Sequence, residues 1–253
     1  MNAHGTPIWY ELMTGDPDAA TRFYAAVTGW RAASGGMAGI EYRILSDDAG
    51  SAGGMMPLPE PGATPAWHVY FGVDDVGGRT AQAVSLGASV LLPPADIPGV
   101  GRFAFLADPQ GARFYLMRGD GEADSDAFSE TARGRCAWNE LRTADQDAAL
   151  GFYGTLLGLE KAGAMPMGEL GDYSFLTLGG RPLGAMMTAP AGQPPAWTFY
   201  FRVPDIDTAK AAVEAGGGTV RNGPSEVPGG DFVVQAADGQ GAAVGFVGKR
   251  GAA

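Results

Sequence analysis

The spacing of apolar side chains near the start of the chain changes from that of a strand to that of a helix and back. Residues 8–13 alternate between two faces, and a period of two predicts a β-strand. Asp16 and Pro17 are residue types favoured at the start of a helix, and Gly29 is placed to end one. Further strand-like runs follow at 41–45 and 53–56. The apolar residues of the predicted helix share one helical face, at Ala20, Phe23, Tyr24 and Val27.

The same order of elements begins again after a Pro-rich connection. Residues 68–73 alternate, Asp74 and Asp75 can cap a helix that runs to about Leu86, and Asp108 to Gly111 reads as a turn between two strands. Each half is therefore a βαβββ module, with a mostly antiparallel sheet and one helix on one face. The strands of the second half are expected near 89–92, 102–107 and 113–117.

The whole pattern is then repeated. Trp9-Tyr10-Glu11-Leu12 recurs as Trp138-Asn139-Glu140-Leu141, and residues 67–111 recur at 197–241. A repeat kept in phase over this length means two copies of one folding unit. We expect an α+β fold in which four βαβββ modules pair into two domains, 1–118 and 134–253, joined by an acidic linker at 119–133.

The composition favours a globular chain without nucleic-acid or membrane partners. It has 253 residues, 45% of them hydrophobic, and a formal net charge of −11. The acidity argues against a nucleic-acid binder, which needs a basic face for phosphates. No secretory signal and no apolar run of ~20 residues is visible, so we expect a cytoplasmic protein. Its single cysteine, Cys136, allows no intramolecular disulfide and is expected to fill the core.

The repeated phrases resemble a known superfamily. The strand, the Asp-capped helix with Phe-Tyr, the following Gly29-Trp30 and the segment Ala107-Asp108-Pro109-Gln110-Gly111 are similar to the vicinal oxygen chelate proteins. That group includes glyoxalase I, bleomycin-resistance proteins and extradiol dioxygenases. The two-domain layout is most similar to a tandem subgroup with a mycobacterial antigen and streptomycete proteins. The resemblance implies cup-shaped mixed sheets, on which lyases, dioxygenases, epimerases and non-catalytic drug binders are all built.

The resemblance also implies where a metal would be held. Metal enzymes of this group take His, Glu or Gln ligands from the first and last strands of each module. Only His68 is an ordinary ligand at those places, and one imidazole does not make a site. We therefore expect no metal and no other cofactor. The places hold Trp9, a position near Gly54, His68 and Tyr115 in the first domain, and Trp138, a position near Ala185, Thr198 and Gly245 in the second.

The residues that share a strand face with these positions predict small-molecule pockets. Each cup would combine a Trp, a Glu, one or two Tyr and at least one Arg, the usual makeup of a ligand site. The candidate catalytic residues are Glu11, His68 and Glu140, since a carboxylate walled by aromatic rings can act as a general acid or base. The candidate ligand-binding residues are Trp9, Tyr70, Arg113, Tyr115, Trp138, Arg142, Thr198, Tyr200 and Arg202.

Each candidate also has a structural alternative. Glu11 and Glu140 can form ion pairs with Arg113 or Arg142, and Trp9 and Trp138 can fill the space that a metal would occupy. The offset of Arg142 and Arg202 resembles that of the arginine that holds the carboxylate of the thiol in glutathione-dependent glyoxalases, with an ion pair to Glu140 as the other reading. His68, Tyr70 and Tyr115 can simply pack in the cup wall.

Three functions compete on these grounds. The first is a metal-free protein that binds a small aromatic or acidic molecule, as a monomer or homodimer. The second is a lyase, isomerase or oxygenase of the glyoxalase type that uses Glu11 or Glu140 as base with His68, so whether the chain is an enzyme stays open. The third is an interaction protein that works through its surface. We favour the first, with the N-terminal cup as the better candidate, because His68 and Tyr115 are replaced by Thr198 and Gly245 in the second copy.

Overall fold

A computed structural model describes residues 2–36, 39–60 and 62–251. The N-terminal repeat contains β1 (Pro7–Thr14), α1 (Pro17–Thr28), β2 (Arg31–Ser34), β3 (Arg43–Asp47), β4 (Gly50–Pro57), β5 (Ala66–Gly72), α2 (Val76–Ser85), β6 (Ser89–Ile97), β7 (Gly101–Ala107) and β8 (Arg113–Gly119). The C-terminal repeat contains β9 (Cys136–Thr143), α3 (Gln146–Leu157), β10 (Leu159–Pro166), the 3-10 helix η1 (Gly168–Leu170), β11 (Asp172–Leu178), β12 (Arg181–Thr188), β13 (Ala196–Arg202), α4 (Ile206–Ala215), β14 (Thr219–Val227), β15 (Asp231–Ala237) and β16 (Ala243–Gly248).

The strands form two eight-stranded mixed sheets with the same order in both repeats. The order is β2-β3-β4-β1-β5-β8-β7-β6 in the first sheet and β10-β11-β12-β9-β13-β16-β15-β14 in the second. Both sheets are open, with an edge strand at each end. The α+β class and the four βαβββ modules are thus confirmed. Strand β2 was not predicted, because Arg31–Ser34 is short and largely exposed and so lacks an apolar alternation.

The helix ends follow the residue types that predicted them. Asp16 accepts a hydrogen bond from the backbone N–H of Ala19 at 2.9 Å, and Asp145 does the same for Ala148 at 3.0 Å. Helix α1 ends at Gly29 with a φ of 82°, a left-handed conformation in which a Cβ is unfavourable. Asp75 occupies the N-cap position of α2, but its side chain makes no capping hydrogen bond.

The chain divides into two compact units that do not follow the repeats. Unit 1 contains the residues up to Ile8 together with His68–Ser125 and Asn139–Trp197, and unit 2 contains Trp9–Trp67, Asp126–Trp138 and the residues from Thr198 onward. Each unit therefore combines one module of the N-terminal repeat with one of the C-terminal repeat. Part of the predicted linker is packed, since Ala127 and Phe128 are buried in unit 2.

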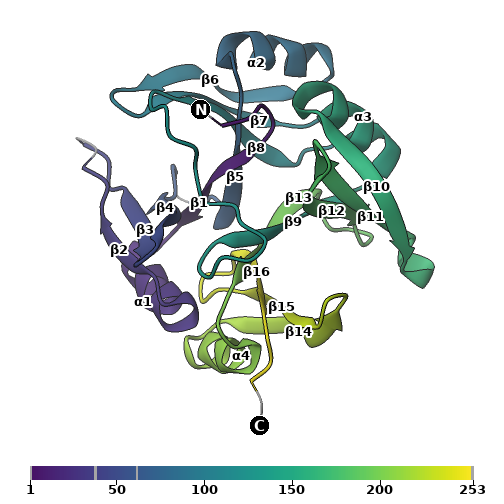
Figure 1. Ribbon diagram of the computed structural model, residues 1–253. Helices are drawn as coiled ribbons and strands as arrows, with labels where there is room; N and C mark the ends of the chain where they lie inside the picture. Colours follow the sequence, from purple (N-terminus) through teal and green to yellow (C-terminus); the bar gives the residue numbers. More distant parts are fainter. Residues whose placement is uncertain (1, 37–38, 61, 252–253) are drawn as a thin grey trace. The chain divides into compact units, whose positions relative to one another are not determined.

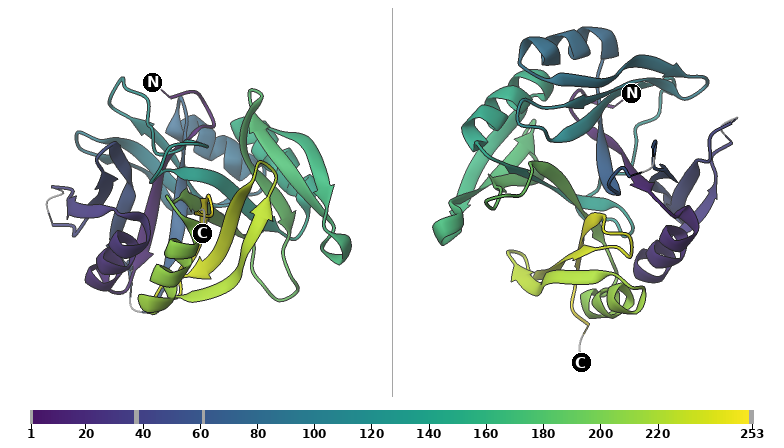
Figure 2. Two further views of the ribbon diagram at one scale, coloured as in Figure 1. Left: turned by 60° about the horizontal axis from the view of Figure 1, so that its bottom comes forward. Right: turned by 180° about the vertical axis from the view of Figure 1, so that it is seen from behind.

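The two helices of each unit contact one another. In unit 1, α2 lies across β6, β7 and β8 (Figure 1) and also contacts α3. In unit 2, α1 and α4 lie side by side (Figure 2). The residues predicted to share the apolar face of the first helix are buried, at Ala20, Phe23, Tyr24 and Val27, and so are Phe152 and Tyr153 of α3. No helix among the described residues is long and apolar enough to cross a membrane.

Candidate functional site

A row of aromatic and apolar side chains crosses four strands of unit 1. The strand register places Tyr70 of β5 opposite Tyr115 of β8, Tyr115 opposite Phe105 of β7, and Phe105 opposite Leu92 of β6. The rings of Tyr70 and Tyr115 stack at 4.0 Å between centroids, and those of Phe105 and Tyr115 at 4.1 Å. Both faces of the Tyr115 ring are therefore covered. Only its edge and hydroxyl are left for a ligand, and its assignment as a ligand-binding residue stays a prediction.

His68 and Arg113 lie on the same face, two residues before Tyr70 and Tyr115. The His68 ring is 5.1 Å from that of Phe105 and 6.1 Å from that of Tyr115 between centroids. Burial, and then the charge of Arg113, lower the pKa of His68 to about 4, so its imidazole is neutral near pH 7.

Arg113 supplies the positive charge of this face. Its side chain is exposed, and it makes no hydrogen bond or ion pair with any residue in the described part of the chain. We call the set Tyr70, Phe105, Tyr115, Leu92, His68 and Arg113 the aromatic wall. Tyr70, Tyr115 and His68 are buried, and the wall becomes accessible toward Leu92, which is 42% exposed.

The corresponding row of the C-terminal repeat lies in unit 2 and is polar. It runs from Tyr200 through Gly245 and Gln235 to Asn222. The Tyr200 ring lies over Gly245, where a Cβ would collide with it. Gln235 Nε2 donates a hydrogen bond to the Tyr200 hydroxyl at 2.6 Å, and Trp138 packs against the buried cluster of Ala137, Tyr200 and Val247. In this polar wall Gln235 bonds to Tyr200, and no counterpart of the Tyr115–Phe105 stack is formed by these residues.

Thr198 and Arg202 flank the polar wall on strand β13. Thr198 is buried. Arg202 donates from Nε to the backbone oxygen of Glu130 and from Nη2 to Asp231, both at 2.9 Å. The expected ion pair with Glu140 is therefore wrong for Arg202, which pairs with Asp231 instead. Its guanidinium is already neutralised, which weakens its candidacy as an anion-binding group.

Glu140 forms the ion pair that was predicted with Arg142. Its carboxylate is buried in unit 1 and accepts from Arg142 Nε at 3.2 Å on one oxygen and from the Tyr173 hydroxyl at 3.1 Å on the other. The two terminal nitrogens of Arg142 bond to no described residue. The contact with Tyr173 was missed. Its signal was an acidic residue followed by tyrosine in both copies, Glu41-Tyr42 and Asp172-Tyr173.

Tyr42 has the matching place in unit 2. Trp9 Nε1 donates to the Tyr42 hydroxyl at 2.8 Å, above Gly54, where a Cβ would collide with that hydroxyl. Gly54 lies opposite Glu11, which is 3% exposed. The two mid-strand glutamates are thus equally buried, but only Glu140 has an arginine two residues along its own strand. Met13 stands at that position beside Glu11.

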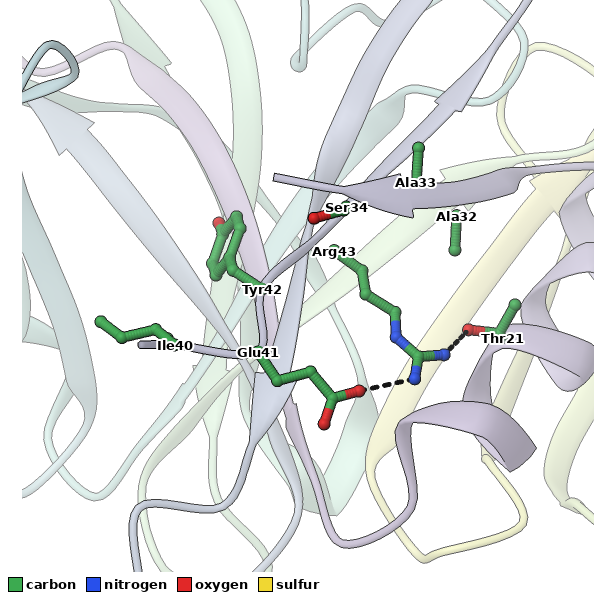
Figure 3. A pocket seen from close by; sticks show the side chains of 8 residues that line it. All are labelled: Thr21, Ala32, Ala33, Ser34, Ile40, Glu41, Tyr42 and Arg43. Atoms are coloured by element: carbon green, nitrogen blue, oxygen red, sulfur yellow. Dashed lines mark hydrogen bonds and ion pairs between the residues drawn. The ribbon is translucent and has the colours of Figure 1, made fainter. Parts of the chain in front are cut away.

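A separate pocket lies beside α1 in unit 2 (Figure 3). Its volume is about 340 Å³, and none of the predicted ligand residues lines it. Arg43 donates to Thr21 at 3.0 Å and to Glu41 at 2.6 Å, and forms an ion pair with Asp18 at 2.7 Å. The arginine is thus fully neutralised. The lining residues are Thr21, Ala32, Ala33, Ser34, Ile40, Glu41, Tyr42 and Arg43.

The residues at the metal positions of the superfamily do not suit a divalent ion. Within residues 2–36, 39–60 and 62–251 no three His, Cys, Asp or Glu side chains converge. In unit 1 His68 has a cation, Arg113, as its charged neighbour, and the Tyr115 ring is covered on both faces. Cationic neighbours and aromatic rings do not replace the oxygen or imidazole ligands that such ions require. Cys136 offers no nucleophile, since burial raises the pKa of its thiol to about 12.

The predicted site residues are divided between the two units. Unit 1 contains His68, Tyr70, Arg113, Tyr115, Glu140 and Arg142, and unit 2 contains Trp9, Glu11, Trp138, Thr198, Tyr200 and Arg202. Phe105 and Leu92 were missed, because the side chain that stands next to Tyr115 depends on strand pairing. The only signal for Phe105 was its place in a predicted strand.

Family comparison agrees with this architecture. A family described as "Glyoxalase-like domain" matches residues 10–117, and "Glyoxalase/Bleomycin resistance protein/Dioxygenase superfamily" matches residues 134–246. The chain belongs to this superfamily. It is 36% identical over 230 residues to "Putative glyoxylase CFP32" of Mycobacterium tuberculosis, covering 88% of this chain and 87% of that protein. It is 31% identical over 250 residues to "Anthracycline biosynthesis protein DnrV" of Streptomyces peucetius, with 89% and 87% covered.

Solved structures of the superfamily share the fold of the chain. The Mn(II)-bound glyoxalase from Novosphingobium aromaticivorans has a TM-score of 0.65 at 16% identity, covering 99% of this chain and 84% of that one. An extradiol ring-cleaving dioxygenase from B. fuscum has a TM-score of 0.69 at 15% identity, with 97% and 72% covered. At such identities the likeness concerns the fold alone.

Proposed function

We propose that the chain binds a planar aromatic molecule that carries an acidic group, and that the aromatic wall holds this molecule without a metal. The observation that carries the proposal is the stacked row Tyr70–Tyr115–Phe105 with the unpaired Arg113 beside it. The polar wall of the other repeat lacks both features. We therefore assign ligand binding to the N-terminal repeat.

The wall can bind the aromatic part of such a ligand by ring contacts and its acidic group by charged hydrogen bonds. Among the stacked rings Phe105 is half-buried, so its edge can meet a molecule that lies across the row, and edge-to-face contact is a favourable arrangement of aromatic rings. Leu92 extends the apolar surface at the accessible end. The Arg113 guanidinium can hold a carboxylate with two parallel hydrogen bonds. His68 is neutral, so it offers a hydrogen bond without a second charge.

The relatives are consistent with an aromatic ligand. Two Streptomyces proteins that are 31% identical to this chain are named for anthracycline biosynthesis. An anthracycline therefore belongs among the compounds to test. Arg142, whose terminal nitrogens are unengaged, is the second candidate for holding an acidic group in unit 1.

Replacing Arg113 by Ala is expected to weaken binding of 2-naphthoate by about ten- to a hundredfold, the usual effect of losing a hydrogen bond to a charged group. Ala is also the residue at the equivalent position, Ala243, of the other repeat. Isothermal titration calorimetry measures the effect, with 2-naphthamide as the uncharged analogue and cyclohexanecarboxylate as the non-aromatic anion. The wild type should prefer 2-naphthoate to both, and the variant should no longer distinguish the acid from the amide.

Arg118→Ala is the matched control for this prediction. It removes the same charge from the same strand, but Arg118 donates to the backbone oxygen of Asp74 and alternates away from the wall face. Its affinity for 2-naphthoate should equal that of the wild type. Equal weakening in both variants, or no binding of these acids and of an anthracycline by the wild type, would contradict the proposed function.

An enzyme of the glyoxalase type is the second candidate. It is favoured by Glu11, a carboxylate that is 3% exposed in the middle of β1 and is repeated as Glu140. Both oxygens of Glu140 accept hydrogen bonds from Arg142 and Tyr173, which suits a structural role, so Glu11 is the stronger candidate for a general base. The part assigned to His68 stays a prediction.

Turnover of the methylglyoxal–thiol hemithioacetal tests this second candidate. An enzyme should lose at least 100-fold in kcat on Glu11→Gln, since general base catalysis contributes about 10²–10⁴-fold. Glu140→Gln changes the equivalent glutamate of the other repeat. It is the control and should retain turnover. If the wild type has no turnover, or if both variants behave like it, the catalytic reading is wrong and the binding proposal stands alone.

A further inference from the structure

A turn of the N-terminal repeat is fastened to a helix of the C-terminal repeat inside unit 1. The Tyr153 hydroxyl of α3 donates to Asp108 Oδ2 at 3.0 Å, and Trp197 Nε1 donates to the same hydroxyl at 3.1 Å. The Gln110 side chain accepts from the backbone N–H of Asp145 at 2.7 Å and donates to its backbone oxygen at 2.8 Å. Asp145 is the N-cap of α3, so this contact joins the turn to the start of that helix. We call this set the clasp.

The same aspartate shapes the chain that leads into the aromatic wall. Asp108 Oδ1 accepts hydrogen bonds from the backbone N–H groups of Gln110 at 2.8 Å and Ala112 at 2.9 Å. The backbone N–H of Asp108 donates to the oxygen of Ala112 at 2.8 Å. Ala112 directly precedes Arg113. The carboxylate that Tyr153 holds therefore also sets the backbone from which Arg113 and Tyr115 project.

Tyr153 supports the wall from behind as well. Phe71 and Phe114 alternate with the wall residues on β5 and β8, so they lie on the opposite face of the sheet. The Tyr153 ring is 5.6 Å from that of Phe114 and 6.5 Å from that of Phe71, and Trp197 is 5.7 Å from Phe71. Interiors packed in this way transmit a displacement rather than absorb it.

We propose that Tyr153 of the C-terminal repeat is a positioning residue for the ligand wall of the N-terminal repeat, acting through Asp108 and Phe114. The inference rests on the proposed function of the aromatic wall. It makes ligand binding a property of unit 1, to which both repeats contribute, so neither repeat supplies the site alone. Gln110 provides a second, exposed connection between the same turn and α3, through its hydrogen bonds to the backbone of Asp145.

Unit 2 contains a chemically identical clasp that serves as an internal control. The Tyr24 hydroxyl donates to Asp238 Oδ2 at 3.1 Å and accepts from Trp67 Nε1 at 2.7 Å. Gln240 bonds the backbone N–H and oxygen of Asp16 at 2.6 and 2.8 Å. This second clasp leads into β16 and so supports the polar wall instead. Removing either hydroxyl deletes the same interactions, but only one of them lies behind the aromatic wall.

The test compares Tyr153→Phe with Tyr24→Phe in the full chain. Both variants should lower the melting temperature by a similar amount, because each orphans one buried carboxylate oxygen and one indole N–H. Affinity for 2-naphthoate should fall about tenfold in Tyr153→Phe only, the loss expected when a supporting contact lets a site loosen. Gln110→Ala, with Gln240→Ala as its control, repeats the comparison if Tyr153→Phe fails to fold.

A readout that needs no ligand accompanies the affinities. The chain has two histidines, so the imidazole NMR signals of His68 are easily assigned. Their positions depend on the rings of Phe105 and Tyr115 and should move in Tyr153→Phe but not in Tyr24→Phe. Unchanged affinity and unchanged His68 signals in Tyr153→Phe, or equal changes in both variants, would overturn the inference. If the wild type binds no acid of the panel, the proposed function fails, and the His68 signals still decide whether Tyr153 positions the wall.

Discussion

Replacing Arg142 by Met is expected to destabilise the fold by about 3 kcal/mol, because the buried Glu140 carboxylate loses its counter-ion. The Glu140 side chain is 3% exposed and that of Arg142 is 21% exposed. Removing one member of a buried pair typically costs about 3–5 kcal/mol, and the partial exposure of Arg142 places the effect at the lower end. The Tyr173 hydroxyl, at 3.1 Å, keeps one hydrogen bond to the carboxylate. Urea unfolding at pH 7 measures the change.

The double variant Glu140→Gln/Arg142→Met is the control for charge. It removes both ions, and Met is the residue that the N-terminal repeat has at the equivalent position, Met13. We expect it to recover most of the lost stability, since a neutral amide costs far less to bury than an unpaired carboxylate. A single variant within about 0.5 kcal/mol of the wild type would show that the pair does not stabilise the fold. A double variant as unstable as the single one would assign the loss to packing.

Acid is expected to remove about 3 kcal/mol of stability through His68 alone. Burial, and then the charge of Arg113, lower its pKa from 6.5 in an ordinary environment to about 4 in the fold. Between these two values the unfolded chain binds a proton that the folded chain does not, so stability falls as the pH decreases through this window. Above this window His68 causes no loss of stability, and below it the loss is complete and no longer changes with pH.

Unfolding free energies of the wild type and of His68→Thr, measured at intervals from pH 7 to pH 4, test this assignment. Thr is the residue that the C-terminal repeat carries at Thr198. The variant should be less stable at pH 7 but should lose less stability on acidification, so the two curves converge. Parallel curves would mean that His68 titrates in the fold as it does in the unfolded chain. Carboxylates elsewhere contribute equally to both proteins and cancel in the difference.

Much of the fold could be predicted because its signals are local. The helices begin at Asp16 and Asp145 and end at Gly29 and Gly158, where the side chain or the left-handed backbone is required by the helix end itself. The alternation in β1 places Trp9 and Glu11 on one face whatever the rest of the chain does. Strand β2 has no such alternation and was missed, since its place in the sheet depends on pairing with β3.

The sequence predicted individual residues of the candidate site, but not which side chains contact one another. The alternation of side chains along each strand predicted that His68, Tyr70, Arg113 and Tyr115 face the same way. The register of β5 and β8 makes them neighbours. Phe105 and Tyr173 were not predicted as partners, because the side chain opposite a strand residue follows from register, and register depends on turns and bulges. The bulges between Val90 and Ala95 decide that Leu92 stands beside Phe105.

The sequence by itself determined the modules, their helix caps and the face of each strand residue. It also determined that the repeats differ at Tyr115 and Gly245. All of these follow from the spacing of residues along one chain segment and from comparing the two copies. Only the tertiary structure decided that Tyr115 is enclosed by two rings, that Arg202 pairs with Asp231, and that unit 1 joins modules from both repeats. The physical reason is that these contacts join residues far apart in the chain, and such contacts are selected by packing and hydrogen bonding in three dimensions.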